Sequence, residues 1–235
     1  DYRVAKVTRR RLSYVAGVII TSLSFSHAAA QTCSFTIDNL NFGGVDLSSG
    51  TTFRTTGNLT AVCSGIPGQR IRICPSIGSG TGGVVSGGDP RYMVNGASQL
   101  QYNIYRNAGY TNVWGSYFWG HPPRPPQPRL RLNGAGTGTR TRPIRAEIAA
   151  GQTTLPAVTY SSSFAGGHTL VAYAYNSVGN CNAIGTANAV QVPFTVTATN
   201  TASCTVSTTN LNFGTTTLLT GNIDNSATVS VTCPS

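Results

Sequence analysis

The six cysteines are the residues of this 235-residue chain whose spacing indicates chemistry most directly. Cys33 opens the sequence Cys-x5-Asn-Leu-Asn-Phe-Gly, and the same sequence opens again at Cys204. A second cysteine closes each copy, at Cys63 and at Cys233. Two copies with one core and one cysteine spacing indicate a tandem duplication of a domain. In an oxidising compartment such cysteines form structural disulfides.

The duplication also favours one disulfide pairing. Four cysteines precede the second copy, and four cysteines permit three connectivities. The second copy holds only two cysteines, so its pair identifies the equivalent pair of the first copy, and the third pair follows by elimination. The expected disulfides are Cys33–Cys63, Cys74–Cys181 and Cys204–Cys233.

Groups for acid–base, nucleophilic or metal chemistry are sparse and far apart. After residue 30 the ionisable side chains other than arginine, cysteine and tyrosine are Asp38, Asp46, Asp89, His121, Glu147, His168 and Asp224. Ser161–Ser163 could be combined with His168 and Asp89 on paper, but no nucleophile-elbow motif supports that set. Gly134-x-Gly136-x-Gly138 lacks the helix and acidic residue of a nucleotide fingerprint, and no Cys-x2-Cys pair suggests zinc. We therefore expect no enzyme, no metal and no cofactor.

Residues 1–30 are typical of an export signal. A basic start (3–11) precedes an apolar stretch (12–25) and the small residues Ala28–Ala30, which suit signal cleavage. The apolar stretch is short for a membrane span, although an anchored N-terminal helix is the alternative. We expect a secreted protein whose mature chain begins at Gln31.

Arginine supplies all the positive charge after residue 30. Eleven arginines stand against five carboxylates there, a formal net charge of +6, and six of them lie between Arg124 and Arg145. Such a run can bind an anionic glycan, lipopolysaccharide or nucleic acid. However, Arg129 and Arg131 alternate with leucines, as on a solvated strand face. We favour the solvated face, keep the anionic glycan as the alternative, and expect no nucleic acid because an exported protein meets little of it.

Alternating polar and apolar residues indicate strands through most of residues 31–199. They occur at 34–37, 59–63, 70–74, 100–105, 129–132, 169–175 and 190–199. No window of a dozen residues shows helical spacing, so we expect an all-β sandwich. The Gly-rich segment 77–88 is expected to be a flexible loop, and the prolines of 121–128 an extended surface segment.

Residues 110–120 hold five aromatic side chains between glycines. They are Tyr110, Trp114, Tyr117, Phe118 and Trp119. Buried, they would be ordinary sandwich core, which we favour for Trp114. Exposed on loops, they would form an apolar contact patch of the kind that marks a binding site. Both alternatives stay open for Tyr117–Trp119.

The chain resembles the spore coat protein U-like (SCPU) domain family, the secreted pilin domains of archaic (Csu-type) chaperone–usher pili. The resemblance rests on the two Cys-x5-Asn-Leu-Asn-Phe-Gly openings, on 100–105 followed by 113–115, on 149–160 and on the strand 192–197. It implies an immunoglobulin-like, pilin-type sandwich at 31–197, a linker at 198–203 and an incomplete second copy at 204–235, so that the chain is expected to be a fragment. Family members leave through a periplasmic chaperone and an outer-membrane usher, and they function in attachment and biofilm formation.

The resemblance also implies a position in the pilus. A pilin sandwich that lacks one strand is completed by a strand from another subunit, which is donor-strand complementation. Only Gln31 and Thr32 precede Cys33, so we expect a tip adhesin at the cell surface rather than a shaft subunit. The expected contact with an abiotic or host surface comprises Val84, Val85, Tyr110, Val113, Tyr117, Phe118 and Trp119. The alternative is a structural spore-coat or pilus-shaft protein without its own ligand.

Overall fold

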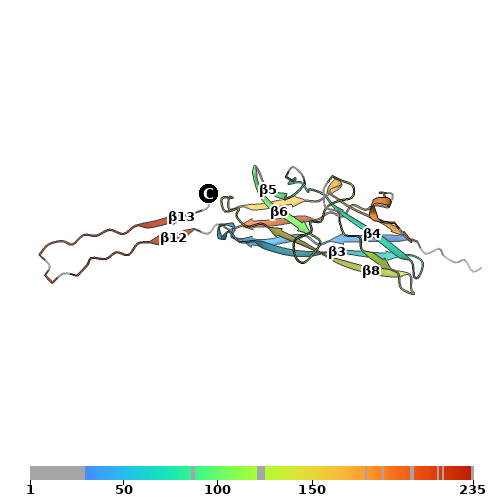
Figure 1. Ribbon diagram of the computed structural model, residues 1–235, viewed down its shortest axis with the longest axis horizontal. Coiled ribbons are helices and arrows are strands. Elements are labelled where there is room, and N and C mark those ends of the chain that lie inside the picture. The colour runs from blue at the N-terminus through green and yellow to red at the C-terminus, as the bar shows by residue number, and fades with distance from the viewer. Residues whose placement is uncertain are drawn as a thin grey trace, which may run out of the picture.

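The computed structural model describes residues 30–233 except 86–87, 121–124, 178, 187, 202–203, 216 and 219. Nearly all of the expected export signal, residues 1–29, lies outside this range. Apart from three single-turn 3-10 helices, the regular elements of the described residues are all strands. They form a sandwich up to residue 201 and a hairpin after Cys204 (Figure 1). The all-β sandwich expected from the alternation is therefore confirmed.

One sheet of the sandwich has eight strands in the order β1-β3-β8-β6-β5-β9-β11-β2. These strands are β1 (Thr32–Ile37), β2 (Leu40–Val45), β3 (Phe53–Ser64), β5 (Arg91–Asn95), β6 (Ser98–Tyr105), β8 (Thr137–Ile148), β9 (Thr159–Ser163) and β11 (Thr195–Asn200). β1 and β2 lie at opposite ends of this order, although only Asp38 and Asn39 separate them in sequence. The sheet therefore curls until its ends meet, and Thr55 Oγ1 of β3 donates to Asn41 O of β2 at 2.8 Å.

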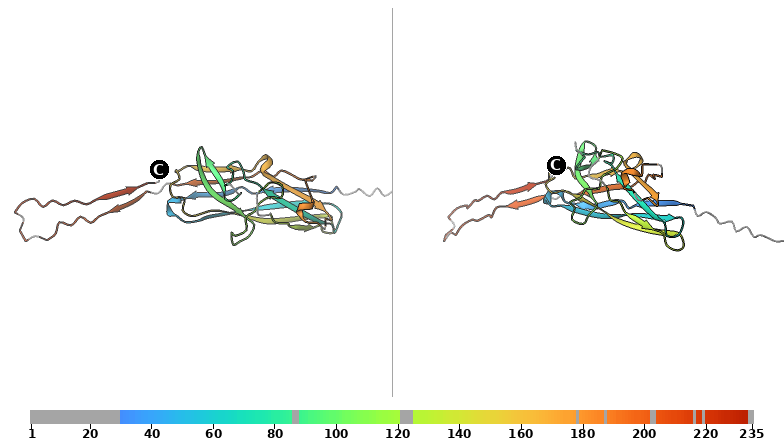
Figure 2. Two further views of the ribbon diagram at one scale, coloured as in Figure 1. Left: turned by 45° about the horizontal axis from the view of Figure 1, so that its top comes forward. Right: turned by 45° about the vertical axis from the view of Figure 1, so that its right-hand side comes forward.

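The second sheet has the order β10-β4-β7 and packs its inner face on the same core as the curled sheet (Figure 2). Its strands are β4 (Arg70–Ile77), β7 (Arg129–Arg131) and β10 (Thr169–Tyr175). Side chains alternate across β4, so Ile71, Ile73 and Ile77 face the core and are buried. Burying each such side chain stabilises the fold by about 1.5–3 kcal/mol.

The 3-10 helices lie in connections between strands. They are η1 (Leu47–Ser49), η2 (Gly166–His168) and η3 (Cys181–Ala183). η3 is tied to β4 by the disulfide Cys74–Cys181, whose Cα atoms are 5.6 Å apart. Cys33–Cys63 joins facing residues of β1 and β3, and Cys204–Cys233 joins the residues just outside β12 and β13, with Cα–Cα distances of 4.1 and 4.2 Å. These are the pairs that the duplication favours.

The second copy consists of β12 (Thr205–Thr208) and β13 (Val229–Thr232), joined in an antiparallel hairpin. All described residues between 204 and 233 are exposed. In Figure 1 this hairpin extends away from the sandwich. We call it the second-copy hairpin.

Several expectations need correction. β5, β8 and β9 are strands that the alternation did not indicate, and within 190–199 the strand begins only at Thr195. β11 then continues to Asn200, so residues 198–200 belong to the strand rather than to a linker.

The segment expected to be a flexible loop (77–88) and the one expected to be extended on the surface (121–128) both contact the sandwich in their described parts. The Gly-rich segment is held against β9, because Thr81 N donates to Ser163 O and Ser163 N donates to Thr81 Oγ1, both at 2.9 Å. Of the proline run, residues 121–124 lie outside the described part, and Pro125 and Pro126 are buried rather than on the surface.

Candidate functional site

The aromatic segment 110–120 crosses the end of β4, and Trp114 is its anchor. Trp114 is fully buried. Its indole Nε1 donates to Pro75 O at 2.9 Å, and its backbone N donates to Ile104 O at 2.7 Å. Trp114 is a core residue, as expected. Its hydrogen bonds fix the position of the backbone that leads to Tyr117, Phe118 and Trp119.

Arg91, a buried residue that the sequence analysis did not single out, binds the same segment. Arg91 Nη2 donates to Trp114 O at 2.6 Å and to Ile77 O at 3.0 Å. Its Nε donates to Gly78 O and its Nη1 to Asn103 Oδ1, both at 2.7 Å. Burial lowers the pKa of Arg91 to about 10, so the group stays charged at neutral pH. One guanidinium thus fastens β4, β5, β6 and the aromatic segment together.

A sequence signal for Arg91 did exist. Side chains two apart share a face of a strand, and Met93, two residues after Arg91, is fully buried. An arginine in register with buried apolar residues must have its donors satisfied internally, because an unpaired buried charge is costly.

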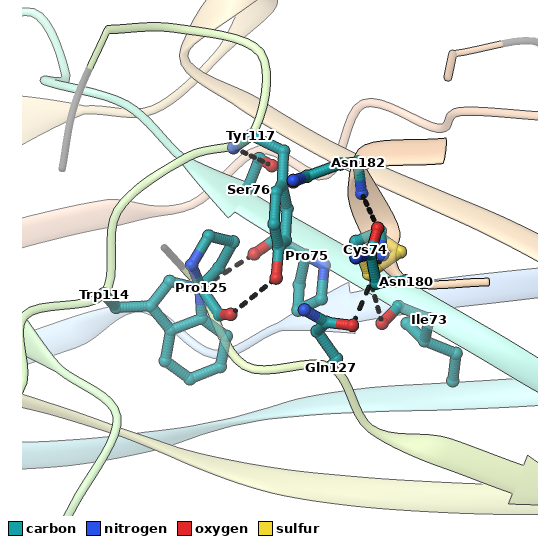
Figure 3. Close-up of a disulfide and its surroundings, with 11 residues drawn as sticks. Ile73, Cys74, Pro75, Ser76, Trp114, Tyr117, Pro125, Gln127, Asn180 and Asn182 are labelled. Atoms are coloured by element: carbon teal, nitrogen blue, oxygen red, sulfur yellow. Dashed lines mark hydrogen bonds between the residues drawn. A yellow bond between two sulfur atoms is a disulfide. The ribbon is translucent and has the colours of Figure 1, made fainter. Parts of the chain in front are cut away.

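Tyr117 and Phe118 pack against the Cys74–Cys181 disulfide and are half-buried. Figure 3 shows Tyr117 beside this disulfide. Tyr117 N donates to Ser76 Oγ at 3.1 Å, and the Tyr117 hydroxyl donates to Pro125 O at 3.0 Å. The backbone N of Phe118 donates to Ser116 Oγ at 3.0 Å. These contacts fix the ring of Tyr117 and the backbone of Phe118 on the outer face of β4.

Trp119 lies on the backbone of Gly78, where a Cβ atom would come within 3.2 Å of its ring. The half-buried Trp119 borders an open cavity of about 330 Å³, which we call the Trp119 hollow. Its lining residues are Gly78, Ser79, Val84, Trp119, Gly120, Gly167 and His168. The structure therefore brings two of the expected contact residues, Val84 and Trp119, into one apolar depression.

The remaining expected contact residues lie elsewhere. Val113 is only 6% exposed and pairs with Tyr105 in an isolated bridge. Tyr110 packs edge-on against Tyr105, and the Arg54 guanidinium lies 4.3 Å from its ring centre. Val85 is half-buried and donates its backbone N to Pro90 O. The seven residues thus do not form one continuous patch.

The site presents aromatic side chains and few ionisable groups. Among the described residues no three His, Cys, Asp or Glu side chains gather as metal ligands would. Likewise, none of the helices in the described part of the chain has the length and hydrophobicity needed to cross a membrane. What the arrangement offers is rigid, partly exposed aromatic surface, which suits binding of apolar groups.

Comparison with known proteins gives a family and a set of distant structures. The Spore Coat Protein U domain model matches residues 19–166 and 190–235. No curated protein matches the chain. One similar solved structure is the CsuC–CsuE chaperone–tip adhesion subunit pre-assembly complex from archaic chaperone–usher Csu pili of Acinetobacter baumannii, with 10% identity and a TM-score of 0.37. The match covers 77% of this chain and 64% of that one.

Two further similar structures have comparable scores. The CupB6 tip adhesin of Pseudomonas aeruginosa is 10% identical, with 73% of this chain and 43% of that chain covered and a TM-score of 0.36. The CooA pilin subunit of enterotoxigenic Escherichia coli is 11% identical, with 71% and 99% covered and a TM-score of 0.34. Because the family model matches most of the sequence, this chain belongs to the Spore Coat Protein U domain family.

Proposed function

We propose that this protein is an exported subunit of a chaperone–usher pilus, that it lies at the pilus tip, and that it attaches cells to abiotic or host surfaces in biofilm formation. Membership of the Spore Coat Protein U domain family supports the pilus assignment. Export through the periplasm to the cell surface is consistent with the three disulfides, which need an oxidising compartment.

The observation that carries the adhesive role is the presentation of Trp119. Its ring borders an open hollow together with Val84 and rests directly on the Gly78 backbone. The backbone N of Trp119 donates to Ser116 Oγ at 3.1 Å, which fixes the backbone from which the side chain projects. A rigid aromatic residue loses little conformational entropy on binding, so this geometry suits attachment to an apolar surface.

The second-copy hairpin supports the assignment of protein partners. Val206, Phe213 and Val229 are each more than half exposed there, and a two-stranded hairpin is marginally stable alone. We propose that strands from outside residues 30–233 cover this face: a chaperone strand in the periplasm, and then a neighbouring pilin after passage through the outer-membrane usher. This is β-augmentation, in which main-chain hydrogen bonds supply much of the affinity.

A structural role, as a coat or shaft protein without its own ligand, is the second candidate. It is favoured by Tyr117 and Phe118, which pack on the Cys74–Cys181 disulfide as core residues would. In that case the aromatic segment stabilises the fold and contacts no surface.

The test compares attachment by bacteria that display the pili. Val84→Ser/Trp119→Ala should reduce attachment to polystyrene by about tenfold or more, since aromatic anchors dominate apolar contacts. The matched control is Tyr110→Ala, which removes a half-buried aromatic ring from a different part of the surface. It should leave attachment unchanged.

Pilus number, counted by electron microscopy, must be the same in all three strains. Normal attachment by the double variant, with normal pili, would contradict the adhesive hollow and favour the structural role. Equal losses in the double variant and in Tyr110→Ala would contradict the assignment to the Trp119 hollow.

A further inference from the structure

Two strands of the smaller sheet place like charges directly opposite one another. In the antiparallel register of β4 and β7, Arg70 faces Arg131 and Arg72 faces Arg129. Between these pairs, Ile71 faces Leu130 and both are buried in the core. All four arginines therefore share the outer face of the sheet. We call Arg70, Arg72, Arg129 and Arg131 the arginine face.

This arrangement costs stability, because like charges directly opposite on neighbouring strands repel. No carboxylate offsets the repulsion: among the described residues the one ion pair is Arg54–Glu147, at 2.6 Å on β3 and β8. The small neighbours Ala172 and Ala174 on β10 add no charge to this face. Exposure to solvent alone does not explain why two pairs of arginines lie directly opposite one another.

Arg72 is the residue of the arginine face that most clearly lacks a hydrogen-bond partner. Its side chain is only 7% exposed, yet its Nε atom has no hydrogen-bond partner. Burial, and then the neighbouring Arg129, lowers the pKa of Arg72, and Tyr117 opposes this shift in part. A buried donor without a partner is destabilising. Arg72 also lines a cavity in which an anionic ligand would pair with its guanidinium group.

Two cavities lie beside Arg129 of this face. One, of about 540 Å³, is lined by Gly68, Arg70, Ile71, Arg72, Arg129, Asn176 and Ser177. The other, of about 350 Å³, is lined by Pro126, Gln127, Pro128, Arg129, Arg140 and Arg142. Arg129 borders both, and Arg142 also has a buried Nε atom without a partner. Together the two cavities are lined by five arginine side chains, Arg70, Arg72, Arg129, Arg140 and Arg142.

We propose that the arginine face and its two cavities bind an anionic glycan, whose sulfate or phosphate groups pair with the guanidinium groups. Planar guanidinium groups bind such groups through two parallel hydrogen bonds. Asn176 and Ser177 add an amide and a hydroxyl group beside them, which suit sugar hydroxyls. This site is separate from the Trp119 hollow and does not depend on a tip position.

Single-stranded nucleic acid is the competing polyanion, and the lining argues against it. Proteins that bind single strands stack the bases on aromatic side chains. The residues that line the two cavities include no aromatic ring. The test therefore includes single-stranded DNA as a separate probe.

The experiment measures binding of the purified exported chain to immobilised heparin, with neutral dextran and polythymidine as further probes. Arg70→Gln/Arg129→Gln removes two exposed arginines of the face and should weaken heparin binding by about tenfold or more. Arg106→Gln/Arg145→Gln makes the same change in net charge outside both cavities and should weaken it less than about twofold. Dextran should not bind, and polythymidine should bind more weakly than heparin.

A stability measurement separates binding from folding. Because Arg129→Gln removes a repulsive pair, its melting temperature should be unchanged or higher by about 1–4 °C while heparin binding falls. Arg72→Gln should also lose binding, and if it fails to fold the Arg70/Arg129 variant still decides.

Equal losses in the two double variants would show attraction by net charge alone and would overturn the proposal. Tighter binding of polythymidine through the same arginines would overturn it in favour of nucleic acid. Unchanged heparin binding by Arg70→Gln/Arg129→Gln would overturn it as well.

Discussion

The two Cys-x5-Asn-Leu-Asn-Phe-Gly segments share one turn and one strand register and have opposite burial. In the first copy Leu40 is 0% exposed and Leu59 is 2% exposed. The equivalent residues of the second copy, Leu211 and Val229, are 50% and 64% exposed. The difference lies in the surroundings, since the first copy is covered by the rest of the sandwich and the second projects away from it (Figure 1).

The local agreement between the two copies extends to single hydrogen bonds. Gly43 N donates to Asn41 Oδ1 at 2.8 Å, and Gly214 N donates to Asn212 Oδ1 at 2.9 Å. The two glycines have φ angles of 70° and 71°. Strand register matches too, because Phe35 faces Ala61 as Val206 faces Val231.

The comparison separates what neighbouring residues determine from what distant strands determine. Turn, register and disulfide follow from the repeated sequence and are present in both copies. Burial of the apolar face needs strands that are remote in sequence, and it is present only in the first copy. We therefore expect strands of a partner to cover the apolar side chains of the second-copy hairpin.

The largest expected effect comes from removing the disulfides. Cys33→Ser/Cys63→Ser should lower the free energy of unfolding of the sandwich by about 3–4 kcal/mol, as loop closure of this length predicts. Cys204→Ser/Cys233→Ser should leave the sandwich unchanged and abolish protection of residues 205–232, because the hairpin alone is marginal. Denaturant unfolding and hydrogen exchange measure the two. Loss of sandwich stability in the second variant would contradict the independence of the hairpin.

The next effect comes from truncating one equivalent leucine. Leu40→Ala should cost about 3 kcal/mol, within the range for buried leucines. Leu211→Ala should change stability by less than about 0.5 kcal/mol, as surface substitutions do. Urea midpoints for the two variants decide. Similar costs at both positions would mean that the second copy is covered in solution.

Alkaline pH should lower the stability of the sandwich and not that of the second-copy hairpin. Burial raises the pKa of Tyr102, Tyr105, Tyr160 and Tyr175 above the usual value near 10. Their stabilisation is present below pH 10 and is lost as pH rises, because the unfolded chain then ionises first. Arg91, whose pKa burial lowers to about 10, acts in the opposite direction and offsets much of the Tyr102 contribution.

The sandwich should therefore lose stability between pH 9 and pH 11, by less than the four tyrosines alone would give. The second-copy hairpin contains no tyrosine between 204 and 233, so its hydrogen-bond protection should not change through this mechanism. Urea midpoints at pH 9, 10 and 11 measure the first effect. A sandwich that gains stability over this range would contradict the tyrosine assignment.

The smallest effects should be similar at the turn of the two copies. Asn41→Ala and Asn212→Ala each remove the acceptor that binds the turn glycine, at a cost of about 0.5–1 kcal/mol, and Asn41→Ala also removes the acceptor of Thr197 Oγ1, at 3.3 Å. Hydrogen exchange at Gly43 and Gly214 reports each turn directly. A change confined to the first copy would show that the sandwich, rather than local sequence, holds this turn.

Sequence predicted those parts of the fold that alternate cleanly. β4, β6, β7 and β10 follow alternating residues and were expected. β8 was not, because its arginines and Pro143 conceal the pattern. Pro143 is tolerated because at that position β8 pairs with β3 only, and pairing with β6 starts at Arg145.

The candidate site was predicted less well, since it depends on contacts between distant segments. Composition marked residues 110–120 as aromatic, but it could not show that Trp119 lies on Gly78 while Tyr110 lies near Arg54. The arginine run also concealed its most informative members, because Arg70 and Arg72 come from β4 and meet Arg131 and Arg129 only through strand pairing.

The most direct test of the central claim, a pilus-tip position, is immunogold labelling of intact pili with an antibody raised against the sandwich. We predict gold particles at one end of each pilus and none along its length, together with loss of attachment in Val84→Ser/Trp119→Ala. Gold particles distributed along the shaft would contradict the tip assignment and establish a structural subunit.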